Sequence, residues 1–412
     1  MLFRYFSTLL FFLPYVLPAQ SSDGGHVILI SFDGFRYDYV EKFDAPNFKK
    51  FVADGAAAEG LIPATPSKTF PNHYSIVTGL YPGSHGLVDN TFYDKELGLK
   101  YQTSNRTQVE NPVFYGGIPL WQLAQQQGLK TASYFWVGSE APILGQHPSY
   151  FFKYDGRVPN RIRIDQAIQW LQLPDTTRPR FITLYFSITD DAGHSFGPNA
   201  PELGSAVMEA DALLGRLMQG LDTLPVYADV LLVSDHGMLE METRAETYEI
   251  LEFLPGYRDS TFTWISNGTH VHIYGSSAEA LRKLEITLQE NKGNFQVFEG
   301  SKTPERWHYR HHRIGDLFLL ANPGHYFTTK AMYDKRLKEK AGPQKWGTHG
   351  FDPITCPEMQ GIFYAKGPNI KAGVKLPAFE NVHIYPFIAK LLGIQAPRVD
   401  GNTEVLAKIL RD

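Results

Sequence analysis

The stretch His26-Val27-Ile28-Leu29-Ile30-Ser31-Phe32 is an almost unbroken apolar run. Such a run is typical of a strand that is covered on both faces. Similar runs follow at 131–136, 181–186, 230–234 and 361–365, and helical patterns lie between the runs, notably at 46–54, 165–171 and 202–221. Because strands alternate with helices, the sequence predicts an α/β fold with a mostly parallel central sheet and helices on both faces.

The pattern changes between residues 239 and 346. Strand-like segments at 269–274, 295–298 and 316–321 surround an amphipathic helical segment at 277–291. This change predicts a small α+β subdomain at about residues 240–346, inserted into one larger domain that covers residues 25–412. We find no internal repeat and no linker long enough to separate independent domains.

Composition limits the class of protein. Of the 412 residues, 43% are hydrophobic and 20% are charged, which argues against a disordered, collagen-like or coiled-coil protein. The net charge of −4 argues against binding to a nucleic-acid duplex. The single cysteine, Cys356, excludes an intrachain disulfide.

The first twenty residues predict a secretory signal peptide. Arg4 is followed by an apolar stretch from residue 5 to residue 18 and then by small and polar residues. The stretch is shorter than the roughly 20 apolar residues that span a bilayer, so we expect no transmembrane anchor in the mature chain. The prediction is an exported protein, periplasmic or secreted; the alternative is a buried N-terminal helix.

Acidic and histidine side chains follow three of the predicted strands. Because ligands of open α/β sheets gather at the carboxyl ends of the strands, these side chains are expected to converge with one more histidine. The candidates are Asp33 after the first strand, Asp190 and His194 after 181–186, Asp235 and His236 after 230–234, and the isolated His349. Each fragment alone is weak evidence for a ligand site, since Asp-Gly is usually a turn and a lone histidine is usually a surface or core residue.

The candidate set mixes imidazole nitrogen with carboxylate oxygen, which suits zinc better than magnesium. Six ligands are more than one tetrahedral ion can bind, but they would provide three protein ligands to each of two ions. Each ion would then keep a position open for a nucleophile, water or substrate.

Thr69 is the candidate nucleophile. Pro71 marks the start of a helix, and Thr69 stands just ahead of it. A hydroxyl beside a helix N-terminus lies in a field that favours anions, including a phosphate. The alternative is that Thr69 only caps the helix. Asn90 by itself indicates a turn.

Taken together, the motifs resemble the nucleotide pyrophosphatase/phosphodiesterase family of the alkaline phosphatase superfamily. The resemblance extends over residues 26 to 393 and implies an alkaline phosphatase-like three-layer sandwich. The motifs are Asp33-Gly34-Phe35-Arg36, Thr69-Phe70-Pro71-Asn72-His73, Gly83-Ser84-His85-Gly86, Asp190-x-x-Gly193-His194-x-x-Gly197-Pro198, Ser234-Asp235-His236-Gly237-Met238 and Thr348-His349-Gly350.

The resemblance implies two zinc ions, with Thr69 as a nucleophile that bridges toward them. One ion would take Asp190, His194 and His349, and the other Asp33, Asp235 and His236. It also implies that Asn90 and the backbone amide of Phe70 bind a phosphate oxygen, and that Phe70 and Tyr154 hold a nucleobase. One departure is Ser187-Ile188-Thr189, which replaces the usual acidic-proline run ahead of Asp190.

The sequence therefore predicts an exported two-zinc phosphodiesterase that acts on small nucleotide diesters or pyrophosphates. A covalent phosphothreonine would form, and nucleoside monophosphates would be released. The alternatives are a phosphomonoesterase, a lipid-head-group phosphodiesterase of the same superfamily, and a catalytically silent zinc- or nucleotide-binding protein. Nothing in the sequence indicates an oligomeric state.

Overall fold

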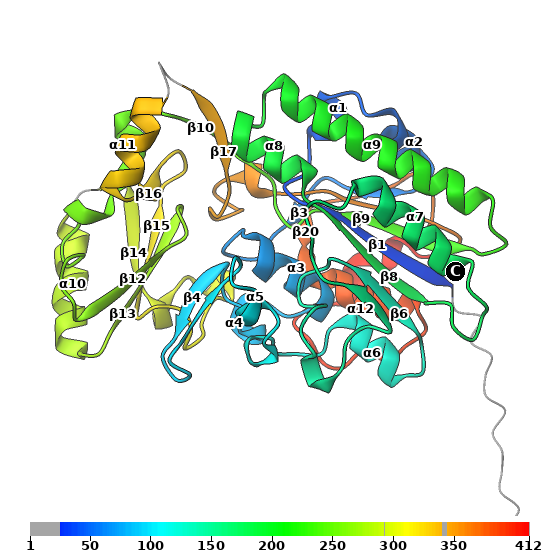
Figure 1. The fold of residues 1–412 in the computed structure, drawn as a ribbon, viewed down its shortest axis with the longest axis horizontal. Coiled ribbons are helices and arrows are strands. Elements are labelled where there is room, and N and C mark those ends of the chain that lie inside the picture. Colours follow the sequence, from blue (N-terminus) through cyan, green and yellow to red (C-terminus); the bar gives the residue numbers. More distant parts are fainter. Residues whose placement is uncertain (1–24, 292, 340–343, 412) are drawn as a thin grey trace, which may run out of the picture.

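The computed structural model describes residues 25–291, 293–339 and 344–411. An eight-stranded sheet forms its centre, with β1 (His26–Phe32) in the interior (Figure 1). The strand order is β19 (Val374–Leu376), β2 (Ala56–Ala58), β18 (Phe363–Lys366), β9 (Ala228–Val233), β1, β8 (Phe181–Phe186), β6 (Thr131–Tyr134) and β7 (Tyr150–Phe152). The expected signal peptide at residues 1–20 lies outside the described residues.

The sheet is mostly parallel, as the sequence predicts. β1 pairs in parallel with both β8 and β9, and β6 pairs in parallel with β7 and β8. β18 runs antiparallel to both of its neighbours, β9 and β2. The carboxyl ends of β1, β8 and β9 therefore meet at one edge of the sheet.

β1 divides the core into two apolar layers. Because side chains alternate along a strand, Val27 and Leu29 face one layer, while Ile28 and Ile30 face the other. The first layer contains side chains of α3 (Thr69–Thr78), α5 (Arg106–Val109), α6 (Leu120–Gln126) and α12 (Ile384–Leu391). The second contains side chains of α1 (Tyr39–Lys42), α2 (Pro46–Ala53), α7 (Asn160–Leu171) and α9 (Pro201–Asp222). The result is a three-layer α/β sandwich (Figure 1).

A second, smaller sheet lies beside the sandwich (Figure 1). It is antiparallel and four-stranded, in the order β12 (Phe262–Ser266), β13 (His270–Gly275), β15 (Leu317–Ala321) and β14 (Phe295–Glu299). The same segment contains α10 (Ala278–Glu290), α11 (Lys330–Glu339) and the parallel pair β11 (Tyr248–Ile250) and β16 (Tyr326–Thr328). The antiparallel pair β10 (Leu239–Glu242) and β17 (Lys345–Thr348) joins its two ends. That residues 240–346 form an inserted subdomain of a domain at 25–412 stays a prediction.

Several boundaries differ from the sequence-based expectation. The helix expected at 165–171 begins at Asn160, and the strand expected at 361–365 runs from Phe363 to Lys366. The edge strands β7 and β19, and β2 beside β19, have three residues each and were not predicted. Strands this short have no measurable period, and the alanines of β2 have little β-propensity.

Thr69 is the first residue of α3 rather than its N-cap, a position that Lys68 occupies. The alternative role of Thr69 as the capping residue is therefore wrong. Among the helices in the described ranges, none has the length and apolar character that crossing a bilayer requires.

Candidate active site

The loops after β1 and β9 bring together Asp33, Asp235 and His236. The Nε2 atom of His236 lies 3.4 Å from Asp33 Oδ1 and 3.0 Å from Asp235 Oδ2, and all three residues are buried. Gly34 makes the turn after Asp33 with a φ of +67°, and its ideal Cβ position is only 3.0 Å from Asp190 Cα. A larger residue would push the β1 loop away from the next element of the site.

That element is α8 (Ile188–Phe196), which follows β8. Asp190 and His194 are four residues apart on this helix and so share a face, with 3.4 Å between Asp190 Oδ1 and His194 Nε2. His349, just after β17, places its Nε2 atom 3.2 Å from that of His194 and 3.8 Å from Asp190 Oδ1. The sequence predicted these residues but not that α8 carries two of them.

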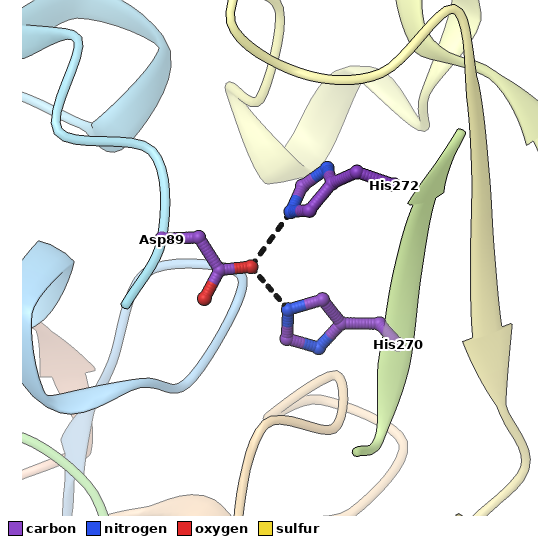
Figure 2. A group of neighbouring side chains, drawn as sticks. All are labelled: Asp89, His270 and His272. Atoms are coloured by element: carbon purple, nitrogen blue, oxygen red, sulfur yellow. Dashed lines mark hydrogen bonds and ion pairs between the residues drawn. The ribbon is translucent and has the colours of Figure 1, made fainter. Parts of the chain in front are cut away.

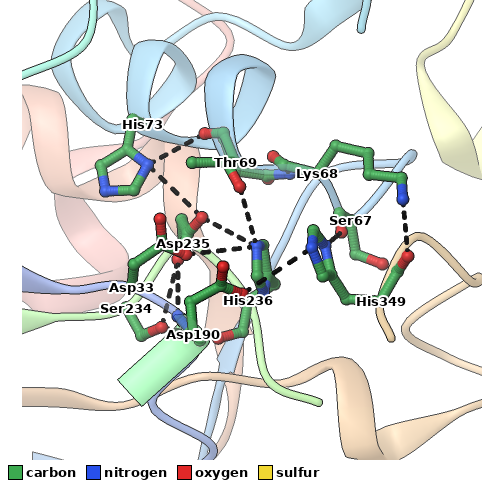
Figure 3. Close-up of polar contacts among 12 residues, drawn as sticks. Asp33, Ser67, Lys68, Thr69, His73, Asp190, Ser234, Asp235, His236 and His349 are labelled. Atoms are coloured by element: carbon green, nitrogen blue, oxygen red, sulfur yellow. Dashed lines mark hydrogen bonds and ion pairs between the residues drawn. The ribbon is translucent and has the colours of Figure 1, made fainter. Parts of the chain in front are cut away.

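The two groups adjoin to form one cluster (Figure 3). The imidazole rings of His236 and His349 stack with their centroids 3.5 Å apart. His236 is close enough to take part in either group, because its ligand atom also lies near those of Asp190 and His349. The structure thus brings all six predicted ligands together, while their division between two ions stays a prediction.

The cluster has the donor chemistry of a cation site. Asp33 Oδ1, Asp190 Oδ1 and Asp235 Oδ2 are buried and have no hydrogen-bond partner within the described part of the chain. Burial and the neighbouring charges of Asp235 and Asp190 raise the pKa of Asp33 well above its usual value. A bound cation would remove both the cost of burying oxygens without hydrogen-bond partners and the cost of burying carboxylate charges. It would satisfy the oxygens and favour the ionised carboxylate.

The histidines are oriented for metal binding. Their Nδ1 atoms each lie close to a backbone carbonyl: His194 to Gly347 at 2.8 Å, His236 to Gly237 at 2.9 Å, and His349 to Ser67 at 2.8 Å. A carbonyl only accepts, so each Nδ1 carries a proton, and in the neutral ring the Nε2 lone pair faces the cluster. Burial, then the charges of His236 and Lys68, lower the pKa of His349 well below its usual value, which favours this neutral form.

Thr69 faces the same cluster from the N-terminus of α3. Its Oγ1 atom lies 3.3 Å from His236 Nε2, and its carbonyl accepts a hydrogen bond of 2.9 Å from His73 Nδ1. Lys68 is buried, and its Nζ donates to the carbonyl of His349 at 2.8 Å. The only predicted nucleophile therefore lies beside the predicted metal ligands (Figure 3).

Asn90 and Phe70 contact each other next to Thr69. The Phe70 N–H donates to Asn90 Oδ1 at 2.9 Å. This hydrogen bond assigns the carbonyl end of the Asn90 side chain and leaves its NH₂ group to face elsewhere. The expectation that both groups bind a phosphate oxygen stays a prediction, and the bond shows that they lie together.

Tyr154 is near the site but separated from Phe70. Its ring packs against Phe135 and lies 6.2 Å from the ring of Tyr185, whose hydroxyl donates to Asp33 Oδ2 at 2.6 Å. Tyr154 is 41% exposed, and within the described residues no ring contact joins it to Phe70. Tyr154 is thus accessible to a ligand, Phe70 is half-buried, and the two rings are not in contact with each other.

Sequence reasoning missed a third polar cluster. Asp89, His270 and His272 are fully buried, and their ligand atoms lie together (Figure 2). It also missed Tyr185 as the partner of Asp33. The alternating His-x-His spacing of His270 and His272 on one strand was a signal for the buried cluster. Its acidic member, Asp89, lies far away in the sequence.

Comparisons with known proteins identify several chains that are similar to this one. The family model described as type I phosphodiesterase/nucleotide pyrophosphatase matches residues 27–352. A venom phosphodiesterase from Crotalus durissus collilineatus is 35% identical over 400 residues, which are 94% of this chain and 46% of the relative. Human ectonucleotide pyrophosphatase/phosphodiesterase family member 1 is 32% identical over 396 residues, 93% of this chain and 42% of the relative. The chain thus spans about half the length of these curated relatives.

The solved structure of murine ectonucleotide pyrophosphatase/phosphodiesterase 5 is also similar. Its TM-score is 0.85 at 26% sequence identity, and the match covers 94% of this chain and 100% of that chain. The expected alkaline phosphatase-like α/β fold is therefore confirmed.

Proposed function

The chain belongs to the type I phosphodiesterase/nucleotide pyrophosphatase family, and we propose that it is an exported enzyme with two zinc ions. It hydrolyses phosphodiester or pyrophosphate bonds of small nucleotides and releases nucleoside monophosphates. One observation carries the proposal: three histidine Nε2 atoms face three carboxylate oxygens beside Thr69 Oγ1, and these oxygens have no hydrogen-bond partner among the described residues.

Thr69 is the nucleophile in this proposal. Bound zinc ions would supply Lewis acidity and lower the pKa of a hydroxyl or water at the site. Thr69 Oγ1 attacks phosphorus in line, the leaving group departs, and a phosphothreonine remains. Water then attacks from the side that the leaving group vacated, which releases the nucleoside monophosphate and restores Thr69.

Asn90 and the first turn of α3 hold the phosphoryl group. The NH₂ group of Asn90 provides a donor for a developing charge on a non-bridging oxygen, and the positive end of the α3 dipole favours that charge. Phe70 and Tyr154 are exposed enough to contact a nucleobase. A solved structure of the murine relative supports this substrate class, since it is described as an inactive threonine-to-alanine variant in complex with AMP.

The charge balance favours diesters over monoesters. The charge of two divalent cations is offset by Asp33, Asp190, Asp235 and a Thr69 alkoxide, which leaves a nearly neutral site. A monoester dianion brings one more negative charge than a diester and normally needs a further cation. Lys68, the nearest cation in sequence, donates to the carbonyl of His349 instead.

Kinetics on one zinc-loaded preparation test the proposal. We expect kcat/KM for nitrophenyl thymidine monophosphate to exceed that for nitrophenyl phosphate. An equal or higher monoester rate would favour a phosphomonoesterase. A higher rate with glycerophosphocholine-type diesters would favour a lipid-head-group phosphodiesterase, and zinc binding without any turnover would favour a silent binding protein.

Export is part of the proposal because residues 1–20 have the pattern of a signal peptide. The names of the relatives, venom phosphodiesterase and ectonucleotide pyrophosphatase/phosphodiesterase, support this location. Fractionation of the expressing cells tests this point, and the enzyme is expected outside the cytoplasmic membrane.

A further inference from the structure

Asp89 joins two distant parts of the chain in a buried hydrogen-bond network (Figure 2). It lies just before β4 (Thr91–Asp94), whereas His270 and His272 lie on β13 of the second sheet. Asp89 Oδ2 contacts His270 Nε2 closely, and it lies 2.7 Å from His272 Nε2 and 3.0 Å from Asn267 Nδ2. All of these contacts converge on one carboxylate oxygen.

The composition of this cluster, one carboxylate and two imidazoles, could hold a metal ion, but its hydrogen bonds argue against one. The Gly315 N–H points at His272 Nδ1 at 3.4 Å, so that nitrogen is the acceptor and Nε2 carries the proton. This is the reverse of the arrangement in His194, His236 and His349, whose Nδ1 atoms face carbonyls.

The carboxylate oxygens show the same contrast. Asp89 Oδ1 and Oδ2 both accept hydrogen bonds, whereas Asp33, Asp190 and Asp235 each keep one buried oxygen without a partner among the described residues. Burial by itself would raise the pKa of Asp89, but His270 and His272 hold it below its usual value. Asp89 is thus an ionised carboxylate that protein donors already satisfy.

The other oxygen of Asp89 leads to the proposed phosphate contact. Asp89 Oδ1 accepts a hydrogen bond of 2.7 Å from the backbone N–H of Asn90. The carbonyl of Asn90 accepts from Thr103 N at 3.1 Å, and its side chain accepts from Phe70 N at 2.9 Å. The network therefore fixes Asn90 through its backbone on one side and through α3 on the other.

We propose that Asp89, His270 and His272 form a metal-free positioning network that holds Asn90 beside Thr69 and so makes β13 part of the catalytic apparatus. The inference rests on the proposed function of Asn90 as a phosphate contact. None of the three residues is proposed to touch substrate. Loosening the network should displace an interaction that is strongest in the transition state, and so lower kcat more than it raises KM.

The test compares His272→Ala with His272→Gln. A glutamine Nε2 amide can occupy nearly the place of the imidazole Nε2–H and donate to Asp89, yet it is a poor metal ligand. We expect His272→Ala to lower kcat on the order of 10-fold, as for other supporting hydrogen bonds. We expect His272→Gln to recover most of that loss, with KM nearly unchanged in both.

The matched control is Tyr274→Phe, two residues along the same strand. The hydroxyl of Tyr274 also links β13 to the β4 segment, because it accepts from Tyr93 N at 3.0 Å and donates to the carbonyl of Arg313 at 2.8 Å. It does not bond to Asp89 or Asn90. This variant is expected to lower stability to denaturant while kcat stays close to that of wild type.

A double-mutant cycle with Asn90→Ala shows whether the network acts through Asn90. In the Asn90→Ala background, His272→Ala should lower kcat by less than about threefold, because the two residues are coupled. If the double variant lost kcat by the product of the two single-variant factors, the residues would act independently and the proposal would be overturned. The proposal would also be overturned if His272→Ala had a lower metal content and His272→Gln did not restore it. That result would identify a third metal site.

The two proposals fail in different ways. A wild-type protein that binds two zinc ions but turns over no diester would contradict the proposed function. In that case calorimetric affinity for orthovanadate, which mimics the transition state of phosphoryl transfer, replaces kcat as the readout. The positioning network then predicts weaker binding in His272→Ala and recovery in His272→Gln, and equal affinities would overturn it.

Discussion

Replacing Tyr185 with phenylalanine should weaken metal binding without disturbing the fold. The hydroxyl of Tyr185 donates to Asp33 Oδ2 at 2.6 Å, which leaves Oδ1 directed at the cluster without a hydrogen-bond partner in the described chain. Phenylalanine keeps the ring and its contacts with His73 and Tyr154. The variant therefore removes one hydrogen bond to a charged group and little else.

The size of the effect follows from that single bond. A hydrogen bond to an ionised group contributes about 1.5–3 kcal/mol. Since about 1.4 kcal/mol corresponds to a factor of ten, the metal dissociation constant should rise about 10- to 100-fold, which is also the range for supporting residues of metal sites. One of the two ions should be affected much more than the other, because Asp33 lies in only one of the two expected ligand groups.

A competitive titration with a chromogenic zinc chelator measures this change. Tyr39→Phe is the control, since the Tyr39 hydroxyl is buried without a partner in the described residues and its loss should leave zinc affinity unchanged. Equal zinc affinities in Tyr185→Phe and wild type would refute the reasoning. They would mean that Asp33 is no ligand or that Tyr185 does not orient it.

Three further results are expected. Chelation should abolish turnover, and added zinc should restore it. His194→Ala and His236→Ala should each lower the occupancy of a different zinc ion. Active protein that contains only magnesium or calcium would contradict the zinc assignment. Tyr154→Ala should reduce kcat/KM tenfold or more for nucleotide substrates but not for aryl diesters without a base, because base stacking contributes roughly 1–3 kcal/mol; equal losses would indicate a purely structural tyrosine. A chiral phosphorothioate diester hydrolysed in oxygen-18 water should give a product with net retention at phosphorus, and inversion would exclude a covalent intermediate on Thr69.

The sequence predicted the parts of the fold that depend on local patterns. The apolar run of β1 indicated a strand covered on both faces, and its alternate side chains do enter two core layers. The acidic and histidine residues after β1, β8 and β9 could be expected to converge, because parallel neighbouring strands end at one edge of the sheet. The structure brings these residues together.

Interactions between distant segments could not be predicted in the same way. Asp89 and His270 are 181 residues apart, and neither has a neighbour in sequence that indicates the other. Tyr185 is one of several aromatic residues in β8, and only the position of Asp33 on the adjacent strand gives its hydroxyl a role. Their pairing depends on the register of strands and on how the second sheet docks, which a single sequence does not specify.

The most direct test of the central claim is to measure turnover and zinc content together in Thr69→Ala. Thr69 is proposed as the nucleophile, while six other side chains hold the metals. The account predicts that diester turnover is abolished and that zinc content stays close to that of wild type. Turnover at the wild-type rate would contradict the covalent mechanism, and loss of both ions would show that Thr69 is mainly structural.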